Sequence, residues 1–64
     1  MKIDVKKLQK LIAIKQETSA SVAARAGISA QAFSAIMQQK SNPRPRTIGR
    51  IAAALNCEIE DITE

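Results

Sequence analysis

Apolar residues recur at helical spacing along nearly the whole chain, and this pattern constrains the fold more than any other feature. Val5, Leu8, Leu11 and Ile12 would share one face of a first helix. This helix is expected to begin after Asp4 and to run to about Gln16. Valine and threonine are few, and no stretch alternates cleanly between apolar and polar residues, so strands are not expected. The sequence therefore predicts an all-α fold.

Further helical segments follow the first, each with a start or stop signal of its own. The second helix is expected to follow a cap at Thr18 or Ser19 and to end at about residue 26. The later segments are expected at residues 30–38, 45–55 and 58–62. Gly27 is placed to end the second helix, Ser29 to cap the third and Pro45 to open the fourth. The predicted architecture is a compact bundle of five short helices.

The chain is short, with 64 residues, so a single domain spanning residues 1–64 is predicted. Its one cysteine, Cys57, cannot form an intramolecular disulfide, and the lack of histidine leaves no plausible metal site. The same lack removes the commonest general base, so neither enzymatic activity nor a cofactor is expected. No apolar run is long enough to cross a membrane, and a free thiol fits a cytoplasmic location.

Charge is distributed unevenly along the chain. Residues 1–50 hold all ten lysines and arginines but only two of the six acidic residues, and the other four acidic residues lie in residues 51–64. A basic body with an acidic tail favours a polyanionic partner for the body. The alternative is that the net charge serves solubility alone.

The third predicted helix has two contrasting faces. Phe33, Ile36 and Met37 would cluster on one side. The opposite side carries small or amide-bearing residues: Gln31, Ser34, Ala35 and Gln38. Such a strip can occupy a DNA major groove without steric or charge penalty, although a merely solvated polar face is the alternative.

Short motifs with a fixed spacing cover nearly the whole chain. They are Thr18-Ser19, Val22-Ala23, Gly27-Ile28-Ser29, Phe33-Ser34, Pro43 or Pro45, and Ile51-Ala52-Ala53-Ala54-Leu55. In these motifs the sequence resembles the lambda-type repressor and Cro family of helix-turn-helix proteins, also called the Xre family. The resemblance implies a lambda repressor-like DNA-binding domain whose recognition helix is the third. Family members often end that helix with a glycine where Gln39 stands, so here it is expected to run on or to end irregularly.

The resemblance also implies which residues contact DNA. The candidates for base contacts are Ala30, Gln31, Ser34, Ala35 and Gln38. The candidates for phosphate contacts are Ser19, Lys40, Ser41, Asn42, Arg44 and Arg46. The chemistry of these residues supports both sets. A glutamine amide can pair with adenine, and an alanine methyl can contact the thymine methyl. Cations beside a helix N-terminus attract phosphate. No lysine or arginine lies within residues 30–39, so the central contacts are expected to favour A·T pairs.

As a function, the resemblance implies a phage or bacterial transcriptional regulator that binds double-stranded operator DNA as a homodimer and represses by occupancy. Ile59 and Ile62 could form the dimer surface or could equally complete the core of the monomer. One rival hypothesis is an antitoxin-like module that binds a protein partner as well as its own operator. An RNA binder is disfavoured, because Phe33 is the only aromatic residue.

Overall fold

The computed structural model describes residues 1–64 and contains four α-helices and one short 3-10 helix. These elements are α1 (Val5–Ile14), α2 (Ser19–Ala26), α3 (Ala30–Met37), α4 (Pro45–Ala54) and η1 (Ile59–Asp61). The all-helical fold is confirmed, but the expected fifth helix is only a turn of 3-10 helix, and α1 ends before Gln16. None of the helices has the length and apolar character that a membrane span requires.

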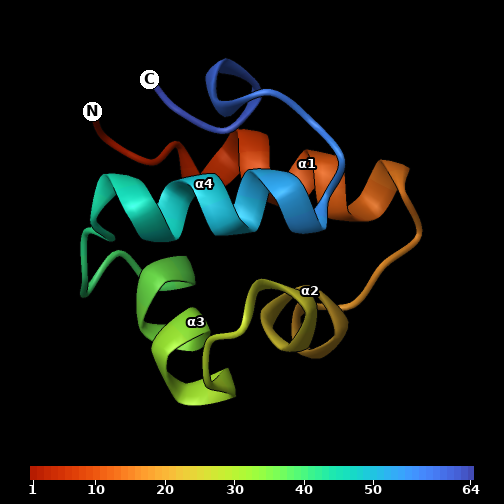
Figure 1. Ribbon diagram of the computed structural model, residues 1–64, viewed down its shortest axis with the longest axis horizontal. Helices are drawn as coiled ribbons and strands as arrows, with labels where there is room; N and C mark the ends of the chain where they lie inside the picture. The colour runs from red at the N-terminus through yellow and green to blue at the C-terminus, as the bar shows by residue number, and fades with distance from the viewer.

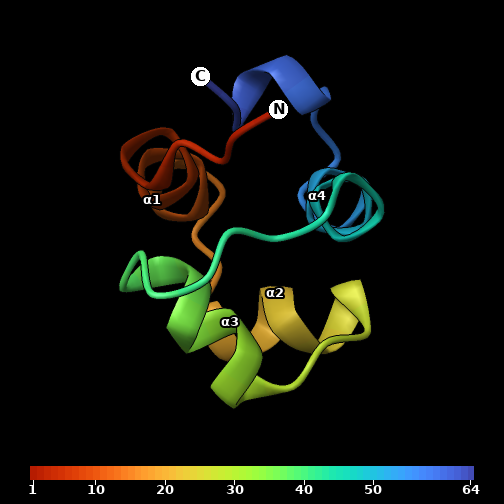
Figure 2. The same ribbon diagram turned by 90° about the vertical axis from the view of Figure 1, so that its left-hand side faces the viewer.

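The helices form two groups around a shared interior. α1 and α4 run along a similar direction, so that both are seen end-on in Figure 2, on opposite sides of the interior. α2 and α3 lie together below this pair, and η1 lies above it, next to both chain ends (Figures 1 and 2). The arrangement therefore separates α3 from the C-terminal residues.

One apolar cluster joins all these elements. Its 14 buried residues are Ile3, Val5, Leu8, Ile12, Val22, Ala23, Ala26, Phe33, Ile36, Ile48, Ile51, Ala52, Leu55 and Ile62. The faces expected from helical spacing are confirmed, with Leu11, Met37 and Ile59 half-buried at the edge of the cluster. Ile62 is fully buried, so it completes the core of the monomer and is not free to form a dimer surface.

The starts of the first three α-helices follow the predicted caps. The Asp4 carboxylate accepts a hydrogen bond from the Lys7 backbone N–H at 3.2 Å. The hydroxyls of Thr18 and Ser29 cap α2 and α3 in the same way, each accepting from a backbone N–H at 3.0 Å. These bonds satisfy N–H groups that the first helical turn leaves without a partner, and so they fix where each helix begins.

The ends of the four α-helices share one geometry. A residue at or just beyond each end adopts left-handed backbone: Gln16 (φ 57°), Gly27 (φ 74°), Gln39 (φ 60°) and Asn56 (φ 54°). At the end of α3, the backbone N–H of Lys40 donates to the carbonyl of Ala35 at 2.9 Å, which closes a Schellman-type cap. The expectation that α3 would run on or end irregularly is therefore wrong, because Gln39 adopts the conformation usually left to glycine.

We expect Gln39→Gly to stabilise the protein by about 1 kcal/mol, because a side chain in left-handed backbone is strained and glycine is not. Chemical denaturation would measure this gain. Gly27→Ala is the matched control and should lower the stability. A Cβ at this position would contact nothing within 4 Å, so the loss would come from the left-handed backbone conformation alone. Equal stability of Gln39→Gly and wild type would show that Gln39 is unstrained.

The two ends of the chain are paired with each other. Ile3 and Thr63 form an isolated antiparallel β-bridge. The backbone N–H of Asp4 donates to the Ile62 carbonyl at 2.8 Å, and the Lys7 ammonium donates to the Thr63 carbonyl at 2.9 Å. The sequence had no strand signal here, so this contact and the burial of Ile3 were not predicted.

Candidate nucleic-acid interface

α2 and α3 are joined by a very short turn and cross steeply (Figure 1). Gly27 makes this turn possible, because its φ of 74° lies in the left-handed region. Ile28 is half-buried and packs against the core from within the turn, as expected for a residue that fills the space between the two helices. The pair is therefore held at a fixed mutual angle by its own apolar contacts.

α3 buries one face and exposes the other. Phe33 and Ile36 lie in the core. Four of the five predicted base-contact residues are exposed, namely Ala30, Gln31, Ser34 and Gln38. Ala35 is half-buried at the margin of this surface, which we call the α3 strip, residues 30, 31, 34, 35 and 38. The strip is uncharged and faces solvent.

A hollow of about 170 Å³ lies between α2 and one side of the α3 strip. It is lined by Ser19, Ala20, Ala30, Phe33, Ser34 and Met37. Ser19 is the first residue of α2 and is exposed, so its hydroxyl lies at a helix N-terminus. The structure thus places one predicted phosphate contact beside two predicted base contacts, Ala30 and Ser34.

A second hollow, of about 320 Å³, lies on the other side of the strip. Ala35 lines this hollow together with three predicted phosphate contacts from the α3–α4 loop: Ser41, Asn42 and Arg44. Thr47 lines the same hollow and was not predicted, although its place in the first turn of α4 could have drawn attention to it. Lys40 and Arg46 are exposed but line neither hollow.

The cations near the α3–α4 loop have no acidic partners. The ion pairs in the structure join Lys2 to Glu64 and Arg25 to Glu17. Lys40, Arg44 and Arg46 are unpaired, and the N-terminus of α4 beside them has no side-chain cap. Because a helix N-terminus carries partial positive charge, this end of the molecule is suited to bind phosphate.

The acidic residues of the C-terminal segment lie elsewhere. η1 is at the opposite end of the molecule from α3 (Figure 2). Its neighbourhood holds Glu58, Glu60, Asp61 and Glu64, all of them exposed. The fold therefore keeps these four carboxylates away from the α3 strip, where they would repel a polyanion.

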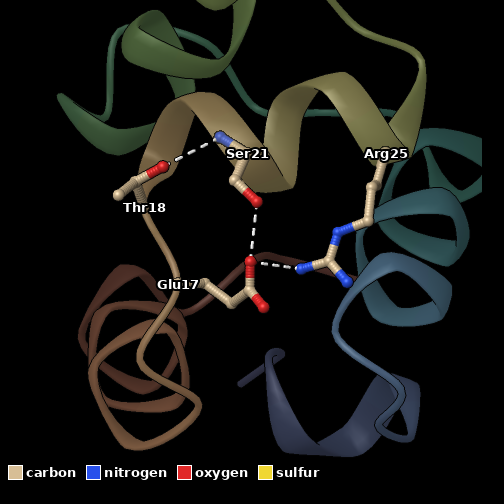
Figure 3. Close-up of polar contacts among 4 residues, drawn as sticks. All are labelled: Glu17, Thr18, Ser21 and Arg25. Carbon is tan, nitrogen blue, oxygen red and sulfur yellow. Dashed lines mark hydrogen bonds and ion pairs between the residues drawn. The ribbon is translucent and has the colours of Figure 1, made fainter.

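Glu17 stands just before α2 and is tied to that helix (Figure 3). Its carboxylate accepts a hydrogen bond from the Ser21 hydroxyl at 2.6 Å and forms an ion pair with Arg25. The Ser21 hydrogen bond, followed by the Arg25 guanidinium, lowers the pKa of Glu17 below its usual value. Arg25 is thereby held by a partner in the protein, unlike the cations of the α3–α4 loop.

The groups gathered around the α3 strip are amides, hydroxyls, methyl groups and cations, which suit recognition rather than bond-making. The one thiol, Cys57, is half-buried, and burial raises its pKa. A raised pKa keeps Cys57 in its unreactive protonated form at neutral pH. No group of three or more histidine, cysteine or acidic side chains could hold a metal ion.

Two short helices at a steep angle, with an exposed polar strip on the second, define a helix-turn-helix unit. The family described as the Cro/C1-type HTH DNA-binding domain matches residues 7–64. The chain belongs to this family of DNA-binding domains, which confirms the resemblance noted in its motifs. A search of curated proteins finds no match to the sequence.

Proposed function

We propose that this protein is a sequence-specific transcriptional regulator that represses by occupying an operator in double-stranded DNA. The observation that carries the proposal is the uncharged α3 strip, which has predicted phosphate contacts on both of its sides. The strip would enter the major groove, with Ser19 and the α3–α4 loop contacting the sugar-phosphate backbone that borders it. Membership of the Cro/C1-type family supports the DNA-binding part of this proposal.

Repression in this proposal needs no catalysis, because a bound protein excludes polymerase from the same DNA. We infer a cytoplasmic homodimer on a palindromic operator, with half-sites about one helical turn apart. Ile62 is buried in the monomer, so the two protomers of a dimer would have to contact each other through other residues. Sedimentation of the full chain, free and on operator DNA, would expose a strictly monomeric binder.

Selection on random duplex DNA is the direct test of the proposal, and Gln31→Ala is its sharpest variant. Gln31 is exposed in the first turn of α3, the end that recognition helices usually present to bases. We expect Gln31→Ala to cost about 1–3 kcal/mol on the selected site and to relax preference at one base pair. Binding titrations on the selected and a scrambled duplex would measure both effects.

The matched control is Gln9→Ala, which removes an exposed glutamine from α1 and should leave affinity unchanged. Binding of Gln31→Ala to scrambled duplex should also barely change, because its phosphate contacts remain. A uniform loss on every sequence would show that Gln31 positions the protein without recognising a base. Recovery of no preferred sequence from the selection would contradict the proposed function itself.

A further inference from the structure

Two side chains of the α3 strip are bonded to each other. Ser34 and Gln38 lie four residues apart, a spacing that places side chains next to each other on a helix face. The Gln38 Nε2 donates a hydrogen bond to the Ser34 Oγ at 3.0 Å, and both residues are exposed. The other glutamine of the strip, Gln31, makes no side-chain hydrogen bond.

This bond determines what the Gln38 amide can offer to a base. It uses one of the two amide hydrogens and leaves the other hydrogen and the Oε1 oxygen free. A donor beside an acceptor is the complement of adenine, which shows the N7 acceptor and the N6 amino donor in the major groove. Guanine shows two acceptors at the same edge, so the Oε1 oxygen would face an acceptor there.

The bond also restrains a long side chain before any DNA is present. A free glutamine loses rotational freedom when it is immobilised at an interface, and this loss weakens binding. The bond to Ser34 already restricts the rotation of the Gln38 side chain in the free protein, whereas the Gln31 side chain has no such bond. The two glutamines of the strip are therefore not equivalent.

We propose that Ser34 is a positioning residue for Gln38, in place of the base contact expected from the resemblance. Its hydroxyl oxygen holds the Gln38 amide in the orientation that recognises adenine over guanine. The ligand is a duplex with adenine at the base pair that faces the C-terminal half of α3. This assignment rests on the proposed function, since it concerns how the same strip recognises its site.

A double-mutant cycle tests the assignment. Wild type, Ser34→Ala, Gln38→Ala and the double variant are titrated on the selected duplex and on one with that A·T pair changed to G·C. We expect Ser34→Ala to lower the preference for adenine by about three- to tenfold, the size of one hydrogen bond. The double variant should lose no more preference than Gln38→Ala alone, and Ser34→Thr, which keeps a hydroxyl, should retain the preference.

The matched control is the pair Ser34→Ala and Gln31→Ala, whose effects should combine independently because no bond joins these residues. A second readout needs no DNA: by NMR relaxation, the Gln38 side-chain amide should be more restrained than that of Gln31, and Ser34→Ala should abolish the difference. Specific binding with independent effects of Ser34 and Gln38 would overturn this assignment alone. Binding to no preferred duplex would overturn the proposed function and the assignment with it.

Discussion

Raising the salt concentration from 50 to 200 mM is expected to weaken operator binding by about a thousandfold. The reason is that Lys40, Arg44 and Arg46 are exposed and have no acidic partners, so their charges are free to displace counterions from phosphate. A dimer would bring six such cations, and each neutralised phosphate adds about −0.9 to the slope of log affinity against log salt, so a slope near −5 is expected. Fluorescence anisotropy titrations at several salt concentrations would measure it.

Single substitutions separate the contribution of phosphate binding by the loop cations from that of base recognition. Arg44→Ala and Arg46→Ala should each weaken binding to all sequences alike and should make the slope shallower by about 0.9 per protomer. Lys10→Ala is the matched control, because it removes an exposed charge from α1 rather than from the α3–α4 loop. An unchanged slope in both arginine variants would rule out this loop as the phosphate-binding element.

Ile62→Ala is expected to remove most of the stability of the fold. Ile62 is fully buried, and truncation of a buried isoleucine to alanine typically costs about 2–5 kcal/mol. A domain of this size has a total stability of about 3–9 kcal/mol, so this loss would be a large fraction of the total. Thermal unfolding followed by circular dichroism would show a much lower Tm.

Deleting residues 59–64 should have at least the same effect, because it removes Ile62 together with the terminal β-bridge. Glu60→Ala is the matched control, since Glu60 is exposed in the same turn and makes no ion pair. A variant at Ile62 that unfolds like wild type but sediments differently would instead place this residue in a dimer surface, contrary to its burial in the monomer.

Sequence reasoning predicted the helices and their buried faces because both depend on local spacing. Caps such as Thr18 and Ser29 act on backbone groups three residues away, so they too can be recognised without tertiary structure. The end of α3 was mispredicted, since the cost of left-handed backbone at Gln39 is small compared with the packing of the whole helix. The pairing of Ile3 with Thr63 joins opposite ends of the chain, and no local pattern encodes it.

The sequence likewise predicted some features of the candidate site and missed others. The outer face of α3 followed from helical periodicity, and four of its five residues are indeed exposed. Thr47 was missed because it joins the site only when the α3–α4 loop folds back beside Ala35. The bond between Ser34 and Gln38 depends on side-chain conformation, which spacing permits but does not determine.

The paired chain ends have a practical consequence for anyone who extends this protein. Met1 and Glu64 emerge side by side, at the end of the molecule remote from α3 (Figure 2). A fluorescent label, an affinity handle or a second folded module could be attached at either terminus and would project away from the α3 strip. A short peptide could also join the two termini, so that new ends could be opened elsewhere in a circularly permuted chain.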